Sequence, residues 1–330
     1  MNPKPDISLI SASRGSPLAL WQAHFVKDLL SARGVTAEIK TWKTTGDIVQ
    51  DRFLHEIGGK GLFIRELEDA MRRGEADFAV HSLKDLPARI PEGFSLTAVL
   101  KRHVSTDVMI FSRDFYRQAG LAAGQLIDER TVKSLGPIRI ATSSLRRAAL
   151  LKGASDDVVT VPVRGNVDTR LKKLESEGWH AIILAEASLE RLSIRDVHAH
   201  TIDPSWFVPC AGQGALAIET LAKSPVEEHI VPLQCATTRL AVDIERSVLA
   251  RLGGDCTMPF GCHVAEDPRT PGNLLARAVL LANDGKSVRV VKSMPKASAE
   301  KGELEQVLID SLRKNGANEI LAMLGIGIRI

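Results

Sequence analysis

The sequence predicts an α/β fold over its first two-thirds and a small α+β domain at its C-terminal end. Strand-like apolar runs alternate with helix-like runs, and this rhythm later changes to a hairpin followed by a helix. The chain has 330 residues, of which 44% are hydrophobic, enough for two or three domains with a sizeable core. The alternation indicates open, parallel-type sheets covered by helices, in which ligands bind at the carboxyl ends of strands.

The elements of the α/β part follow from local signals. Ile7 to Ala12 is a predicted strand, and Ser16-Pro17 predicts an N-cap with proline at the first helical position, so a helix runs to about Arg33. Leu62 to Arg73 is amphipathic at helical spacing and closes at Gly74. Further strands are predicted at Val35 to Trp42, Ala76 to His81, Val108 to Phe111, Ile138 to Ala141, Val158 to Val163 and Ala181 to Ala185.

The last third has a different pattern. Leu274 to Leu281 and Ser287 to Lys292 predict a hairpin, because Asn283-Asp284-Gly285 between them is a strong turn signal. A terminal helix is expected from roughly Glu300 to Asn315. Breaks between domains are expected near residues 101–106 and 232–237.

Composition argues against several classes of protein. The net charge of +3 is too mild for a general nucleic-acid binder, and 4% aromatic residues with a single tyrosine argue against a base-stacking surface. There is no run of 18 apolar residues and no secretory signal pattern. We therefore expect a cytoplasmic enzyme or binding protein with neither a nucleic-acid nor a membrane partner.

The four cysteines predict neither disulfides nor a metal site. Cys210, Cys235, Cys256 and Cys262 form no C-x-x-C pair, and disulfides are not expected without export. Cys256 and Cys262 could be combined with His263, but this spacing matches no common zinc pattern.

Two groups of arginines at predicted helix starts form the most informative motif. Arg146 and Arg147 follow the predicted cap Ser144, and Arg164 and Arg170 flank Asn166. Cations at a helix start are unfavourable by about a few tenths of a kcal/mol. Their presence therefore indicates a bound carboxylate or phosphate, on which N–H groups, hydroxyls and guanidinium groups converge. The alternative is that these arginines are solvated or paired with surface Asp and Glu.

Three loops carry further candidates. The glycine-rich residues 58–63 lack P-loop spacing and predict either a mobile lid or a plain loop. Residues 81–87 end a strand and contain Ser82, Lys84 and Asp85, whose carboxylate could stabilise positive charge or transfer a proton, or could merely cap a turn. Residues 251–261 hold Cys256 among glycines, as a nucleophile, an attachment point or a buried structural thiol.

Together these motifs resemble the porphobilinogen deaminase family, also called hydroxymethylbilane synthases, over essentially the whole chain. The segments that carry the resemblance are Arg14 to Gln22, Gly58 to Phe63, His81 to Pro87, Thr142 to Arg147, Arg164 to Arg170, Gly212 to Ala215 and the Cys256 loop.

The resemblance implies an α/β fold with two lobes similar to periplasmic binding proteins, each on a doubly wound sheet, and a small C-terminal α+β domain. Lobe 1 would comprise residues 1–103 and 215–232, and lobe 2 residues 106–208. Hinges are expected near 101–106 and 209–214, with the active site in the cleft between the lobes. Residues 237–330 would form the third domain and carry a dipyrromethane cofactor attached through Cys256.

The resemblance also implies a role for each matching residue. Asp85 would be the catalytic carboxylate. Cofactor binding is implied for Lys84, Ser144, Arg146, Arg147 and Arg170, in addition to covalent attachment at Cys256. Substrate binding is implied for Arg14, Ser16, Phe63, Arg164, Arg191 and Gln213. No metal is implied.

The implied reaction joins four porphobilinogen molecules head to tail with loss of ammonia and releases hydroxymethylbilane by hydrolysis, in tetrapyrrole and haem biosynthesis. Asp85 would stabilise cationic azafulvene and pyrrole intermediates. The resemblance suggests a monomer whose partner is the small molecule porphobilinogen. The alternative is a non-catalytic two-lobed binding protein for small anions, which would explain the arginines but neither Asp85 nor Cys256. The chain departs from the commonest family pattern at Thr45, Glu56, Ser188 and Asp255.

Overall fold

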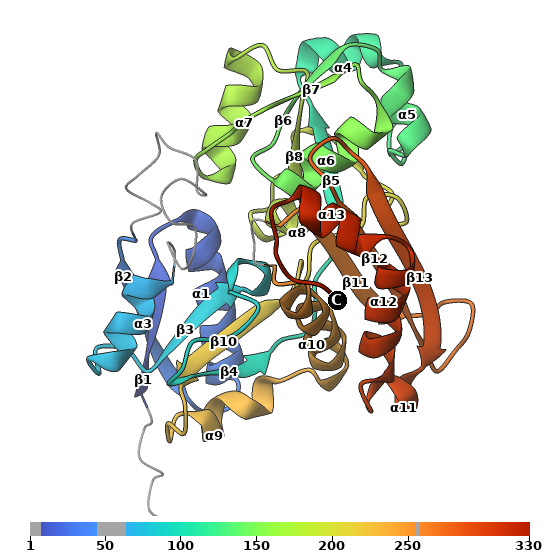
Figure 1. Ribbon diagram of the computed structural model, residues 1–330. Coiled ribbons are helices and arrows are strands. Elements are labelled where there is room, and N and C mark those ends of the chain that lie inside the picture. Colours follow the sequence, from blue (N-terminus) through green and yellow to red (C-terminus); the bar gives the residue numbers. More distant parts are fainter. Residues whose placement is uncertain (1–7, 45–63, 255–257) are drawn as a thin grey trace, which may run out of the picture. The chain divides into compact units, whose positions relative to one another are not determined.

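The computed structural model describes residues 8–44, 64–254 and 258–330, and they fold as two compact units (Figure 1). The first unit contains the chain up to His103 together with Gly214–Arg239. The second contains Val104–Gln213 together with Leu240–Ile330. Each unit therefore joins segments that are far apart in the sequence, and its core depends on long-range contacts.

The described part of the first unit is built on a five-stranded sheet in the order β2-β1-β3-β10-β4. Strand β1 runs parallel to β2 and β3, as the sequence predicts, whereas β10, from the segment that returns from the second unit, runs antiparallel to β3 and β4. The strands are β1 Ser8–Arg14, β2 Thr36–Trp42, β3 Phe78–Ser82, β4 Phe94–Val99 and β10 Leu216–Leu221. The helices are α1 Pro17–Ser31, α3 Arg65–Arg72, η1 Leu83–Asp85, α9 Glu227–Ile230 and η2 Val231–Leu233.

Helix α1 shows how local signals and burial combine in this unit. Ser16 caps the helix, since its Oγ accepts the N–H of Ala19 at 3.3 Å, and Pro17 begins it, as predicted. Val26 and Leu30 lie four residues apart on one face and are fully buried against the sheet.

The second unit begins with another five-stranded sheet, in the order β7-β6-β8-β5-β9. Strand β6 is parallel to β7 and β8, and β5 is antiparallel to β8 and β9. The strands are β5 Asp107–Phe111, β6 Ile138–Ala141, β7 Val158–Val161, β8 Ala181–Ala185 and β9 His198–Thr201. The helices are α4 Arg113–Ala119, α5 Glu129–Ser134, α6 Leu145–Ala154, α7 Val167–Ser176 and α8 Glu186–Arg191. The sheet places the carboxyl ends of β6, β7 and β8 at one edge.

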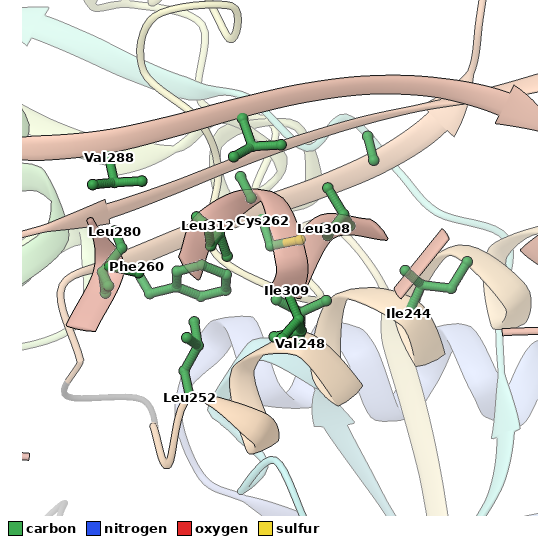
Figure 2. Packing of buried hydrophobic residues seen from close by; sticks show 14 of the residues in the cluster. Ile244, Val248, Leu252, Phe260, Cys262, Leu280, Val288, Leu308, Ile309 and Leu312 are labelled. Carbon is green, nitrogen blue, oxygen red and sulfur yellow. The ribbon is translucent and has the colours of Figure 1, made fainter. Parts of the chain in front are cut away.

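The C-terminal part of the second unit is a three-stranded antiparallel sheet with helices, which confirms the predicted α+β character. The predicted hairpin is present, and sequence reasoning missed the first strand, the 16-residue helix that precedes it and two short helices. Figure 2 shows the core, in which Val248 and Leu252 pack with Phe260, Leu308 and Leu312. The elements are α10 Ala236–Arg251, whose residues up to Arg239 belong to the first unit, β11 Phe260–Glu266, β12 Asn273–Leu281, β13 Ser287–Pro295, α11 Lys296–Ala299, α12 Glu303–Lys314 and α13 Ala317–Met323.

The two sheets of the second unit are packed closely against each other. Val279 and Leu281 of β12 belong to the hydrophobic core of the β5–β9 sheet. A Cβ on Gly153 of α6 would lie 2.8 Å from the carbonyl oxygen of Gly285 in the hairpin turn. Only glycine permits this approach of two backbones, so the hairpin lies directly against the end of α6.

Candidate functional site

The first unit gathers four of the predicted site residues at the carboxyl edge of its parallel strands. Arg14 is the last residue of β1, and Ser16 follows it as the cap of α1. Lys84 and Asp85 follow β3, which pairs in parallel with β1 through Ser11 and Ala12. Parallel neighbours end at the same edge of a sheet, so these four residues share one edge, as expected for a ligand site in an α/β fold.

Asp85 projects from a turn that is fixed by its neighbours. Leu83 and Leu86 are buried on either side of it. The N–H of Leu83 donates to the carbonyl of Ala215 at 3.0 Å, and the N–H of Leu86 donates to the carbonyl of Leu83 at 3.2 Å. Asp85 itself is exposed, and Lys84 is half-buried. The turn therefore holds a carboxylate in a defined backbone position while leaving it open to a ligand.

A side-chain hydrogen bond ties α1 to the end of β3. Gln22 is 3% exposed, and its Nε2 donates to Oγ of Ser82 at 2.8 Å. The cap at Ser16 and the turn after Ser82 are thereby held in register, although 60 residues separate Gln22 from Ser82. Sequence reasoning did not identify Gln22 in this role.

A buried pair of ionisable groups lies in the same sheet. His81 Nε2 lies 3.0 Å from Oε2 of Glu219, and both side chains are buried. Burial, followed by the Glu219 carboxylate, raises the pKa of the nearby Glu68 above its ordinary value. The sequence pointed to the segment of His81 but gave no sign of its partner, which lies 138 residues further along the chain.

In the second unit, Ser143 joins the loops that follow β6 and β7. Its Oγ donates to the carbonyl of Val163 at 2.7 Å and accepts the N–H of the same residue at 2.9 Å. Next to it, Ser144 caps α6, as predicted, because its Oγ accepts the N–H of Arg147 at 3.4 Å. This junction brings the two predicted arginine groups to the same carboxyl edge of the sheet.

Arg164 and Arg170 are half-buried at this edge. Arg170 Nε donates to the carbonyl of Gly165 at 2.7 Å. Gly165 has φ +107°, and a Cβ there would lie 2.9 Å from Cγ2 of Thr169, so the turn between the two arginines requires glycine. Asn166 occupies the predicted N-cap position of α7, but within the described residues its side chain makes no capping hydrogen bond.

Arg146 and Arg147 are buried, with exposed fractions of 3% and 8%. Nη2 of Arg146 donates to Oδ2 of Asp107 at 2.7 Å, and Nη2 of Arg147 donates to Oδ1 at 2.7 Å. Burial alone would raise the pKa of Asp107, but the charges of Arg146 and Arg147 hold it well below its usual range. Both arginines thus pair with a carboxylate inside the protein, whereas the sequence indicated either a bound anion or an ion pair at the surface.

Gln213 and Arg191 are also buried in the second unit, with exposed fractions of 1% and 5%. Nε2 of Gln213 donates to the carbonyl of Ser105 at 2.7 Å and to Oδ1 of Asp107 at 3.0 Å. Arg191 lies in the last turn of α8. Asp107 is the residue that sequence reasoning missed. Its signal was an acidic residue at the head of a wholly apolar strand, a position at which burial demands a partner.

Other sequence predictions fall outside these two groups. Phe63 and Cys256 lie outside the described residues, as do Thr45, Glu56 and Asp255. Ser188 lies in α8, where its carbonyl accepts the N–H of Leu192 at 3.2 Å.

The described residues contain neither a metal-binding cluster nor a membrane-spanning helix. Cys262 points into the apolar core of the C-terminal sheet (Figure 2), whereas Nε2 of His263 lies 2.9 Å from Oγ of Ser105. No three His, Cys, Asp or Glu side chains among the described residues come together in a way that could hold a metal ion. No helix in that part of the chain is both long and apolar enough to cross a membrane.

The model of the family described as "Porphobilinogen deaminase, dipyromethane cofactor binding domain" matches residues 9–228. The porphobilinogen deaminase of Albidiferax ferrireducens is 42% identical over 257 residues, covering 78% of this chain and 77% of that protein. The porphobilinogen deaminase of Ralstonia nicotianae is 39% identical over 322 residues, covering 96% of this chain and 92% of that protein. The chain therefore belongs to the porphobilinogen deaminase family.

Proposed function

We propose that this protein is the transferase that joins four porphobilinogen molecules head to tail, with loss of ammonia, to form hydroxymethylbilane for tetrapyrrole biosynthesis. Family membership supports this activity. The structural observation that carries it is Asp85, an exposed carboxylate on a turn that Leu83 and Leu86 anchor. A protein that only binds anions would have no use for a carboxylate at this edge, because it would repel them.

The charged groups at the two sheet edges suit the substrate. Porphobilinogen carries two carboxylates, and each added unit brings two more. Arg164 and Arg170 can form forked hydrogen bonds with carboxylates. Arg14, Ser16 and Lys84 supply a guanidinium, a hydroxyl and an ammonium group at the edge that carries Asp85. We propose Phe63, Arg191 and Gln213 as further substrate contacts.

We propose that Cys256 carries a covalently attached dipyrromethane cofactor, with Lys84, Ser144, Arg146, Arg147 and Arg170 binding its carboxylates. The donor set fits such a group. A guanidinium has five N–H donors. In Arg146, Nη1 donates to the carbonyl of Val208 and Nη2 donates to Asp107, while Nε is buried without a hydrogen-bond partner among the described residues. When bound, such a cofactor supplies an electron-rich pyrrole carbon to which the first substrate unit can be joined.

Asp85 has the chemistry that the reaction needs. Loss of ammonia from porphobilinogen leaves a positively charged pyrrole species, which a nearby carboxylate stabilises more strongly than it stabilises the neutral reactant. The same carboxylate can accept the proton that leaves the pyrrole ring when the new bond forms. Because the turn around Leu83 fixes the backbone, the carboxylate needs little reorganisation during the step.

The proposal is tested by intact mass spectrometry combined with product formation from porphobilinogen. The parent protein should be heavier than its polypeptide by two linked pyrrole units and should form hydroxymethylbilane. Cys256→Ser should lose both the added mass and the activity. Cys235→Ser is the matched control, since Cys235 is a half-buried thiol elsewhere in the chain, and it should keep both.

Two outcomes would contradict the proposal in different ways. An unmodified protein with full activity would exclude the cofactor assignment. A protein that carries the cofactor, binds porphobilinogen and forms no product would favour the non-catalytic binding protein instead. We also propose that the protein acts as a cytoplasmic monomer, and sedimentation of the loaded protein would test its monomeric state.

A further inference from the structure

We propose that Asp107 is a positioning residue, which fixes the guanidinium planes of Arg146 and Arg147 and links them to the chain crossings through Gln213. This inference rests on the proposed function, in which Arg146 and Arg147 bind carboxylates of the cofactor. Asp107 itself would touch neither cofactor nor substrate.

Asp107 holds both guanidinium groups through direct hydrogen bonds. Oδ2 of Asp107 accepts Nη2 of Arg146 at 2.7 Å, while Oδ1 accepts both Nε and Nη2 of Arg147 at 3.2 and 2.7 Å. Each guanidinium has a second anchor, since Nη1 of Arg146 donates to Val208 at 2.8 Å and Nη1 of Arg147 donates to Ile183 at 2.9 Å. Two anchors on different sides of a planar group fix its orientation, and Asp107 is the anchor that both planes share.

Asp107 also offsets the buried positive charge of the two arginines. The Asp107 side chain is fully buried, and the two guanidinium groups are almost so. Two neighbouring cations could not be buried without a nearby anion, because desolvation and mutual repulsion oppose it. The three groups together carry one net positive charge. The set can therefore stay folded in the absence of ligand and still attract a carboxylate.

Gln213 links Asp107 to the two places, called crossings here, at which the chain passes from one unit to the other. The chain passes between the units at residues 103–104 and 213–214. Gln213 Nε2 donates to Ser105 on one crossing at 2.7 Å and to Asp107 at 3.0 Å. Within the first unit, the N–H of His103 donates to the carbonyl of Gly214 at 3.1 Å, so the two crossings run side by side. A change in the path of either crossing would therefore displace the arginine pair through the Gln213 amide and the Asp107 carboxylate.

Asp107→Asn separates positioning from simple charge. The substitution keeps the shape and removes the anion, so the arginine pair would carry an additional net charge. If charge alone mattered, anionic ligands would bind more tightly and KM for porphobilinogen would fall. If Asp107 fixes the guanidinium planes, the planes become mobile and hold less firmly the cofactor to which porphobilinogen is joined. KM for porphobilinogen then rises by about tenfold or more, the scale of one charged hydrogen bond.

The experiment combines kinetics with NMR of the guanidinium groups in the full-length loaded protein. In the parent, restricted rotation should give resolved, slowly exchanging Nη signals for Arg146 and Arg147, assigned with single Arg→Lys variants. Asp107→Asn should average these signals and raise KM. Glu186→Gln is the matched control, because Glu186 is a half-buried carboxylate of the same unit and accepts its hydrogen bonds from Thr106 and Thr201. It should leave both the signals and KM at parent values.

Asp107→Glu keeps the inference testable if Asp107→Asn does not fold. It retains the charge and displaces the carboxylate by one methylene. Positioning predicts shifted guanidinium signals and a raised KM, whereas a role in charge alone predicts parent values. Parent-like signals and KM in either folded variant would overturn the inference. Averaged signals in Asp107→Asn, together with a parent protein that never converts porphobilinogen, would support positioning while refuting the proposed function.

Discussion

Arg147→Leu should destabilise the protein. This loss of stability distinguishes a structural role of Arg147, as the partner of Asp107, from a role in ligand binding alone. The substitution removes two hydrogen bonds to Asp107 and one to the carbonyl of Ile183. Removing one partner of a buried ion pair costs about 3–5 kcal/mol. Asp107 retains Arg146 and Gln213, so we expect the lower end, about 3 kcal/mol.

The assay is urea unfolding at pH 7, followed by circular dichroism. Arg139→Leu provides the matched control, since Arg139 is an exposed arginine in strand β6 of the same sheet and should change stability by less than about 0.5 kcal/mol. In a double-mutant cycle, Asp107→Asn combined with Arg147→Leu should lose at least about 1 kcal/mol less than the sum of the single losses.

The reasoning is refuted if Arg147→Leu is as stable as Arg139→Leu and the cycle shows no coupling. In that event Arg147 would act only on a ligand, as the sequence alone suggested. A loss of cofactor without loss of stability would point the same way.

Two further predictions concern carboxylates of the first unit. Asp85→Asn should leave the unfolding free energy unchanged, because the side chain is exposed, while turnover of porphobilinogen falls by about a hundredfold or more in protein of normal cofactor mass; near-normal turnover would move the acid–base role to another group. Glu68→Gln should raise the unfolding free energy at pH 7, because burial and Glu219 raise the pKa of Glu68 and its ionised form therefore opposes folding. The gain should vanish as the pH falls below the ordinary glutamate range, and the exposed control Glu92→Gln should show no gain at either pH.

Local signals in the sequence determined most of the secondary structure and the sheet edges at which the proposed site residues lie. Ser16-Pro17 and Ser144 begin helices as predicted, because a cap depends on a side chain and a backbone N–H only three residues away. The Asn283-Asp284-Gly285 turn joins β12 to β13, since a tight turn also depends on its own residues. The order of strands and helices then predicted that Asp85 and the arginine groups would lie at carboxyl ends.

Only the tertiary structure decided what the charged side chains contact. Asp107 meets Arg146 and Arg147 across 39 and 40 residues, and His81 meets Glu219 across 138 residues. Strand β10 is likewise paired with a distant part of the sequence, since it belongs to the segment that returns from the second unit and runs antiparallel to β3. Such pairings leave no periodic mark in the sequence, because they depend on which distant strands become neighbours. The sequence could therefore predict that arginines gather at a sheet edge, but not that two of them are held by a buried aspartate.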